Sequence, residues 1–153
     1  MSAHDDTVAA NLSRLRAHAA LLVGTRTTAD SCVWVVLEAV QANPGLLRSE
    51  HGCRLGLLRL LHRVSVGLLA PLPGARTVDD PLAGLTTEER QAVLLLDVER
   101  LSPQAAAFVV GRGPGSLVIA LASAHRRLND TSRPAPADPP RRSTAEATLQ
   151  ARQ

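Results

Sequence analysis

The chain has 153 residues, enough for one medium-sized domain or two small ones, and 45% of them are hydrophobic, which is ample for a core. It contains one Trp, one Phe and no Tyr, so its core must consist mainly of Leu, Val and Ala, which favours packed helices over an aromatic-rich β-sandwich. The net charge is +3, but residues 1–130 contain 13 arginines and 12 carboxylates, and such a nearly neutral body argues against an independent DNA-binding protein.

The first half of the chain predicts three helices, over residues 7–23, 28–42 and 53–69. In the first of them, leucine and alanine recur at helical spacing. Thr27 or Thr28 is expected to cap the second. The third helix is apolar over a wider arc than a single core face requires.

The second predicted helix has an inward stripe and two large apolar residues that lie off it. Val33, Leu37 and Val40 follow the spacing i, i+4 and i+7 and are expected to face the core. Trp34 and Val35 fall outside this stripe. Because tryptophan is usually buried, a structural role is one interpretation of Trp34, and its enrichment at interface hot spots supports contact with a partner as the other.

The second half of the chain predicts a helix-turn-helix unit over residues 85–130. Each helix is preceded by a threonine or a serine, whose side chains cap helix N-termini, and a glycine-rich tight turn separates the last two helices. The expected caps are Thr86 or Thr87, Ser102 and Ser116, the turn is Gly111–Gly115, and the last helix runs from Leu117 to Leu128.

Two proline-rich stretches lie outside these helices. Residues 70–84 are expected to link an N-terminal domain, residues 7–69, to the helix-turn-helix domain. Residues 131–153 cannot bury enough apolar surface to order themselves, so a disordered tail is expected there.

The segment from Val110 to Leu128 resembles region 4 of extracytoplasmic-function sigma factors and aligns with it without a gap. In that family, the recognition helix carries lysine, serine and arginine just after its first hydrophobic residue, where they meet DNA. This chain has Val118, Ile119 and Ala120 at those positions, and Ser123 at a later arginine position. Apolar side chains supply neither donors for base edges nor cations for phosphates, so the resemblance implies a helix-turn-helix without its DNA contacts.

The second predicted helix occupies the place of sigma region 2.2. The glutamine–glutamate pair with which that region holds the polymerase clamp corresponds to Trp34 and Val35. Over roughly residues 8–128, the chain resembles the sigma-like output domain of PhyR-type general stress response regulators. The receiver domain that PhyR carries after this region is not present in the 153 residues.

This resemblance implies an all-α fold of two small helical lobes, a sigma region 2-like bundle and a sigma region 4-like helix-turn-helix. It also implies a sigma-factor mimic, or anti-anti-sigma factor, which binds a NepR-like anti-sigma factor and thereby releases a stress sigma factor. Little or no binding to DNA or core polymerase is expected. The candidate partner-binding residues are Trp34, Val35, Leu58, Leu61, Val118, Ile119 and Ala122.

Other interpretations stay open at this point. A divergent extracytoplasmic-function sigma factor or DNA-binding regulator would also carry this pattern, as would a degenerate sigma-like dimerisation module. For Val118 and Ile119, incidental exposure or packing between the lobes is the alternative to partner contact.

No catalytic or metal-binding pattern stands out, so neither enzyme activity nor a cofactor is expected. Gly111–Gly115 follows a predicted helix rather than a strand, which excludes a nucleotide-binding loop. The spacing of His51, Cys53 and His62 fits no common zinc pattern. Since the N-terminus is polar and no apolar stretch reaches about 18–20 residues, a cytoplasmic location without membrane contact is expected.

Overall fold

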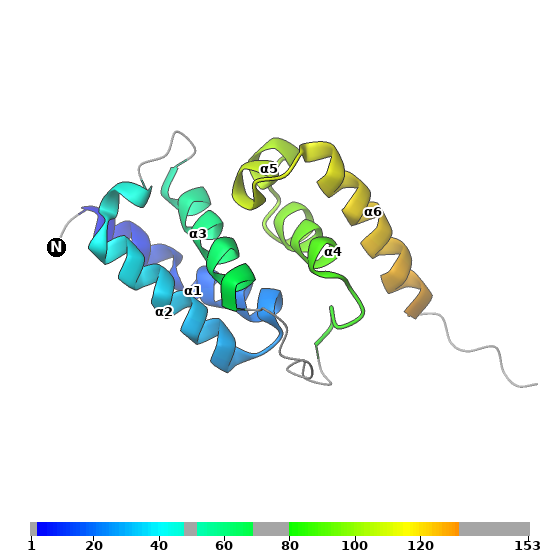
Figure 1. Cartoon of the computed structure of the whole chain (residues 1–153), viewed down its shortest axis with the longest axis horizontal. Coiled ribbons are helices and arrows are strands. Elements are labelled where there is room, and N and C mark those ends of the chain that lie inside the picture. Colours follow the sequence, from blue (N-terminus) through cyan, green and yellow to red (C-terminus); the bar gives the residue numbers. More distant parts are fainter. Residues whose placement is uncertain (1–2, 48–51, 69–79, 132–153) are drawn as a thin grey trace, which may run out of the picture.

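The computed structural model describes residues 3–47, 52–68 and 80–131, and all regular elements in these ranges are helical (Figure 1). The expected all-α class is therefore confirmed. The predicted tail beyond residue 131 and residues 69–79, which include most of the predicted linker, lie outside the described residues.

The N-terminal bundle consists of three helices and one short connecting turn. Their bounds are α1 (Ala3–Val23), α2 (Arg26–Ala42), the short 3-10 helix η1 (Pro44–Leu47) and α3 (Gly52–Leu68). The cap of α2 is Thr25 rather than the expected Thr27 or Thr28, because Gly24 takes a positive φ of 83° and ends α1 directly before it. The Thr25 hydroxyl oxygen accepts the backbone N–H of Thr28.

The C-terminal bundle begins with α4 (Thr87–Ala92), which continues into the π-helical segment η2 (Val93–Val98). It is completed by α5 (Pro103–Val110) and α6 (Pro114–Thr131), which run on either side of the glycine-rich turn. Sequence periodicity predicted an ordinary helix through residues 92–96, so the wider π-helical segment is a feature that the apolar pattern did not reveal.

Two of the three expected caps in this bundle are confirmed. Thr86 and Glu89 form a capping box, in which each side chain accepts the backbone N–H of the other residue. Ser102 accepts the N–H of Ala105 ahead of the proline that opens α5. Ser116 is not a cap: α6 starts two residues earlier, at Pro114, and the Ser116 hydroxyl donates to the Gly113 carbonyl inside the first turn.

The two bundles pack against each other through α3. This helix contacts α1 and α2 on one side and α5 on the other, and α1 also contacts η2 (Figure 1). The buried apolar side chains of both bundles form one continuous cluster. The wide apolar arc of the third helix is therefore explained by packing on two sides.

A buried arginine on α4 joins the two bundles where α1 ends. Arg90 on α4 is 2% exposed and donates to the Leu21 carbonyl at the end of α1, at 2.7 Å. The same guanidinium binds both carboxylate oxygens of Asp80 and the carbonyl of Leu82. The turn from Asp80 onward, expected to be linker, is thus part of the C-terminal bundle, and Leu85 is buried in it.

No single helix in the described ranges is both long and apolar enough to cross a membrane. The pair Pro103–Val110 and Pro114–Asp130 passes by length and composition together, but it is bent by 99° at the break.

Replacing Arg90 by alanine should be strongly destabilising, because it removes the cation that balances the charge of the buried Asp80 carboxylate. We expect a loss of about 3–5 kcal/mol in the free energy of unfolding, measured by urea titration. The matched control is Arg112→Ala, which removes an ion pair with Glu88 whose side chains are both exposed and should cost no more than about 1 kcal/mol. Equal losses in the two variants would contradict the role assigned to Arg90.

Candidate functional site

One candidate surface lies on the outward face of α2. Trp34 is 64% exposed and Val35 is 39% exposed, whereas Val33, Val36 and Val40 are buried in the core. The expectation that both residues lie off the inward stripe is confirmed, and the alternative of a buried tryptophan is wrong. We call Trp34 and Val35 the α2 patch. It is framed by the polar residues Arg26, Thr27, Asp30 and Ser31, which share the same shallow depression.

A second candidate surface lies on the first two turns of α6. Val118 is 48% exposed and Ile119 is 71% exposed, and Ala122, one turn further on, is also exposed. Leu117 and Ala124, two turns apart on the opposite face of α6, are buried in the core. We call Val118, Ile119 and Ala122 the α6 patch.

Two other positions that the sigma resemblance assigned to DNA contact point elsewhere. Ala120 is half-buried and packs against the core, so only two of the three positions after Leu117 belong to the surface. The Ser123 hydroxyl donates to the Glu89 carboxylate at 2.6 Å and ties α6 to the capping box of α4. This hydrogen bond is the largest contribution that holds the pKa of Glu89 below its usual range. Ser123 thus has a structural role.

Leu58 and Leu61 were expected to belong to the partner-binding surface, and the structure corrects this. Their side chains are 3% and 0% exposed. Both lie on α3, whose second apolar face is covered by the C-terminal bundle. The wide apolar arc is used for packing inside this chain, because α3 contacts α1 and α2 on one side and α5 on the other.

The α2 and α6 patches are not brought together. In Figure 1, α2 and α6 lie on opposite flanks, and α3 and α5 form successive neighbours between them. A partner that touches both patches must therefore extend across the contact between the bundles. Seven predicted residues thus resolve into two surface patches and two core leucines.

Few cations accompany the α6 patch. Arg112 in the preceding turn pairs with Glu88, and Arg127 pairs with Glu89. Arg126 is exposed, a full turn beyond Ala122. The outward face of this helix therefore begins with apolar side chains where phosphate and base contacts require cations and hydrogen-bond donors.

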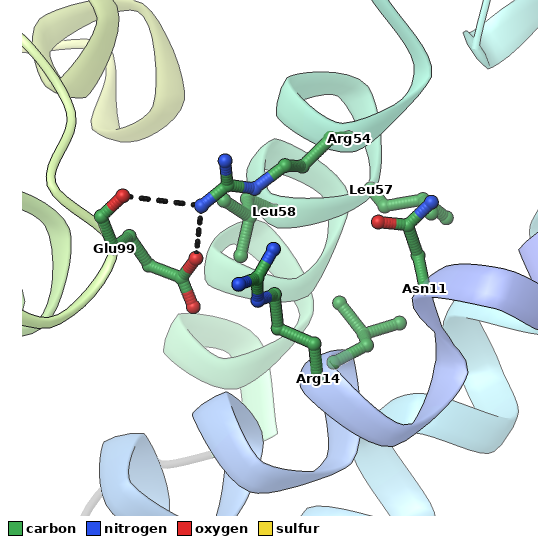
Figure 2. Close-up of a pocket in the computed structure, with 7 residues that line it drawn as sticks. Asn11, Arg14, Arg54, Leu57, Leu58 and Glu99 are labelled. Atoms are coloured by element: carbon green, nitrogen blue, oxygen red, sulfur yellow. Dashed lines mark hydrogen bonds and ion pairs between the residues drawn. The ribbon is translucent and has the colours of Figure 1, made fainter.

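A buried polar cluster between the bundles was missed by sequence analysis. His18 on α1, Arg54 and His62 on α3, and Glu99 after η2 form it, and we call it the histidine cluster. His18 lies 3.1 Å from the Glu99 carboxylate and 3.0 Å from His62. Arg54 also donates to Glu99, as Figure 2 shows. No local motif signals it, because Glu99 is 81 residues from His18 along the chain.

The described residues contain no group of three or more His, Cys, Asp or Glu side chains that could hold a metal ion. Of the three residues considered for zinc, His62 binds His18 and Cys53 is half-buried with a thiol pKa raised by burial. His51 lies outside the described residues.

The arrangement of a helical bundle followed by a packed helix-turn-helix defines a two-lobed, sigma-factor-like protein. Residues 8–62 match the model of the Sigma2 domain of PhyR. The N-terminal bundle therefore matches the sigma-like half of PhyR, as the resemblance implied. Comparison with curated protein sequences gives no significant match.

Several solved structures share the fold. The PhyRSL–NepR complex from Sphingomonas sp. Fr1 matches with a TM-score of 0.72 and 25% identity, over 91% of this chain and 96% of that chain. The anti-anti-sigma factor PhyR of Bartonella quintana, complexed with the anti-sigma factor NepR, gives a TM-score of 0.68 and 24% identity over 84% of this chain. This chain spans 51% of that PhyR chain. The sigma factor RpoE of the same organism, in complex with NepR, matches with a TM-score of 0.70 at 17% identity, over 82% of this chain and 94% of that one.

The exposure of Trp34 is directly measurable, because it is the only tryptophan in the chain. We expect the free protein to emit at the wavelength of a hydrated indole and to be quenched by acrylamide nearly as strongly as a free tryptophan amide. Leu46→Trp in a Trp34→Phe background, at another exposed position, provides the matched reference. A blue-shifted emission that resists the quencher would show that Trp34 is covered.

Proposed function

We propose that this protein is a sigma-factor mimic, an anti-anti-sigma factor that binds a NepR-like anti-sigma factor through the α2 and α6 patches. The observation that carries the proposal is the exposed Val118–Ile119 pair at the start of α6, the place where a sigma factor presents polar side chains to DNA. Binding would withdraw the anti-sigma factor from a stress sigma factor and release the latter to the polymerase.

Exposed apolar side chains suit a helical protein partner. Each buried square ångström of apolar surface stabilises a complex by about 25 cal/mol before the costs of ordering, and large apolar anchors dominate interface energetics. An amphipathic helix presents anchors at i, i+3, i+4 and i+7, which match an apolar strip on another helix. The similarity to the PhyRSL–NepR complex supports an anti-sigma factor as that partner.

The separation of the two patches favours an extended partner. A segment that reaches from α2 to α6 crosses the seam between the bundles and uses each patch as a separate anchor. Linking two weak contacts in one molecule raises the effective concentration at the second site, so modest patches can still support tight binding.

The apolar residues of the two patches also disfavour binding to polymerase and to DNA. Trp34 and Val35 replace the polar pair that holds polymerase in the sigma family, and Val118 and Ile119 remove donors from the recognition helix. Such a protein has the shape that the anti-sigma factor binds but lacks the charged groups that DNA binding requires. It is therefore selective for the protein partner because its surface disfavours DNA. The proposal therefore includes weak or absent DNA and polymerase binding, no enzymatic reaction and a cytoplasmic place of action.

The test is a binding titration against a NepR-like anti-sigma factor, comparing the wild-type protein with the double variant Val118→Arg/Ile119→Glu. Two exposed residues are replaced, so the helical circular dichroism should not change. We expect the variant to bind at least about 30-fold more weakly, the loss of about 2 kcal/mol that defines an interface hot spot.

The matched control is Leu46→Arg, since Leu46 is an exposed apolar residue on η1 outside both patches. It should bind like the wild type. If the double variant binds as tightly as the control, the α6 patch is not the contact surface. If the wild type instead binds promoter DNA or core polymerase at about 0.15 M salt, where weak phosphate contacts are screened, the protein is a divergent sigma factor.

A further inference from the structure

The contact between the bundles contains a buried pair of histidines that the proposed outer surface does not use. His18 and His62 are each 2% exposed, and their Nε2 atoms lie 3.0 Å apart. Nδ1 of His18 lies 3.1 Å from Oε1 of Glu99, which belongs to the C-terminal bundle. The pair is therefore part of the joint that holds the two bundles together.

The geometry of the pair limits its protonation. Two nitrogens at hydrogen-bond distance accommodate one hydrogen between them. When Glu99 is ionised, His18 donates its Nδ1–H to it, and in the neutral pair His18 Nε2 accepts the hydrogen of His62 Nε2. One added proton preserves this arrangement. A second places hydrogens on both Nε2 atoms, pointing at each other, and puts two cations into a buried site.

We propose that the histidine cluster is an acid-sensitive latch: separation of the C-terminal bundle from α1 and α3 uncovers His62, which then accepts the second proton of the His18–His62 pair that the closed arrangement excludes. This inference does not depend on the identity of the partner, because the opening takes place within the chain itself.

The surroundings oppose a second cation. Among the residues that the structure describes, Glu99 is the one carboxylate within hydrogen-bond distance of the pair, and it already accepts from Arg54 (Figure 2). Arg14 of α1 lines the small cavity beside Glu99, as Figure 2 shows. On the other side of His62 lies a hollow of about 260 Å³, through which a proton can approach. Its other lining residues are Arg63 and Val66 of α3, Gln91 of α4, and Val109 and Val110 of α5.

The titration of the cluster has a defined direction. Burial, assisted by the neighbouring His18, lowers the pKa of His62 to about 3. The contribution of the neutral, buried His62 to the stability of the closed form is therefore fully present above about pH 6.5, the pKa of an exposed imidazole. It is lost progressively as the pH falls. The hydrogen bond donated by His18, with another from Arg54, lowers the pKa of Glu99 to about 2 against the opposing effect of burial. The Glu99 contribution is thus lost only in stronger acid.

The size of the effect follows from proton linkage. If the separated bundles take up one proton more than the closed form, the ratio of open to closed molecules rises about 10-fold between pH 7.5 and pH 5.5. Opening would also expose Leu58, which lies on α3 between Arg54 and His62 at i+4 from the first and i−4 from the second.

The experiment is single-molecule energy transfer on the full chain, with dyes on Glu38→Cys of α2 and Arg126→Cys of α6. Cys32→Ala and Cys53→Ser remove the native thiols. We expect the population of molecules with a long dye separation to rise about 10-fold from pH 7.5 to pH 5.5. The helical circular dichroism should stay unchanged, because the bundles separate without unfolding.

Two variants isolate the cause. In His62→Gln, the amide donates to His18 but does not titrate, so the open population should no longer depend on pH over this range. His125→Gln is the matched control, because His125 is exposed on α6 and pairs with Asp97 inside its own bundle. It should respond like the wild type. An equal pH response in His62→Gln, no rise in the wild type, or loss of helicity at pH 5.5 would each overturn the latch.

Discussion

The contact of α1 and α3 with the C-terminal bundle determines which apolar residues of this protein remain free for a partner. It combines apolar packing with buried polar bonds: Arg90 holds the end of α1, the histidine cluster holds its middle, and the Arg59 guanidinium lies 4.5 Å from the ring centroid of Phe108. Buried donors and acceptors of this kind stabilise one relative placement, because a shifted arrangement would leave charges unpaired. With the second face of α3 used internally, the outward faces of α2 and α6 are left as the main candidates for recognition.

Those two faces have the same chemical character for related reasons. A sigma factor needs polar contacts to polymerase from one lobe and to DNA from the other, whereas a mimic needs only a shape that an anti-sigma factor accepts. Trp34, Val118 and Ile119 retain the helix positions but replace hydrogen-bonding and charged groups with apolar ones. The helix-turn-helix framework itself is preserved through bonds that face inward, such as the one between Ser123 and Glu89.

Sequence analysis predicted the features that depend on local pattern. The low aromatic content and the sigma-like resemblance predicted the all-α class, and helical spacing placed Trp34 off the inward stripe of α2, since that placement depends only on residues within two turns. Helix starts were less predictable: competing threonines and serines can cap, and the choice among them depends on where the preceding glycine turns the chain. The cap of α2 was displaced for this reason, whereas α6 begins two residues before Ser116, at Pro114.

The features of the candidate site that sequence analysis missed depend on contacts between distant segments. Leu58 and Leu61 carry the same apolar signal whether a partner or the other bundle covers them, so composition could not separate the two cases. His18, His62 and Glu99 come from three segments, and none of them has a motif around it.

One extended protein partner is expected to cover the α2 patch and the α6 patch together. Hydrogen-exchange mass spectrometry of this chain, free and bound to a NepR-like anti-sigma factor, reports on both patches in a single experiment. Exchange should slow in two separate stretches, around Trp34 on α2 and around Ile119 on α6. Protection confined to one bundle, or found only on helices that carry neither patch, would rule out a partner that spans both patches.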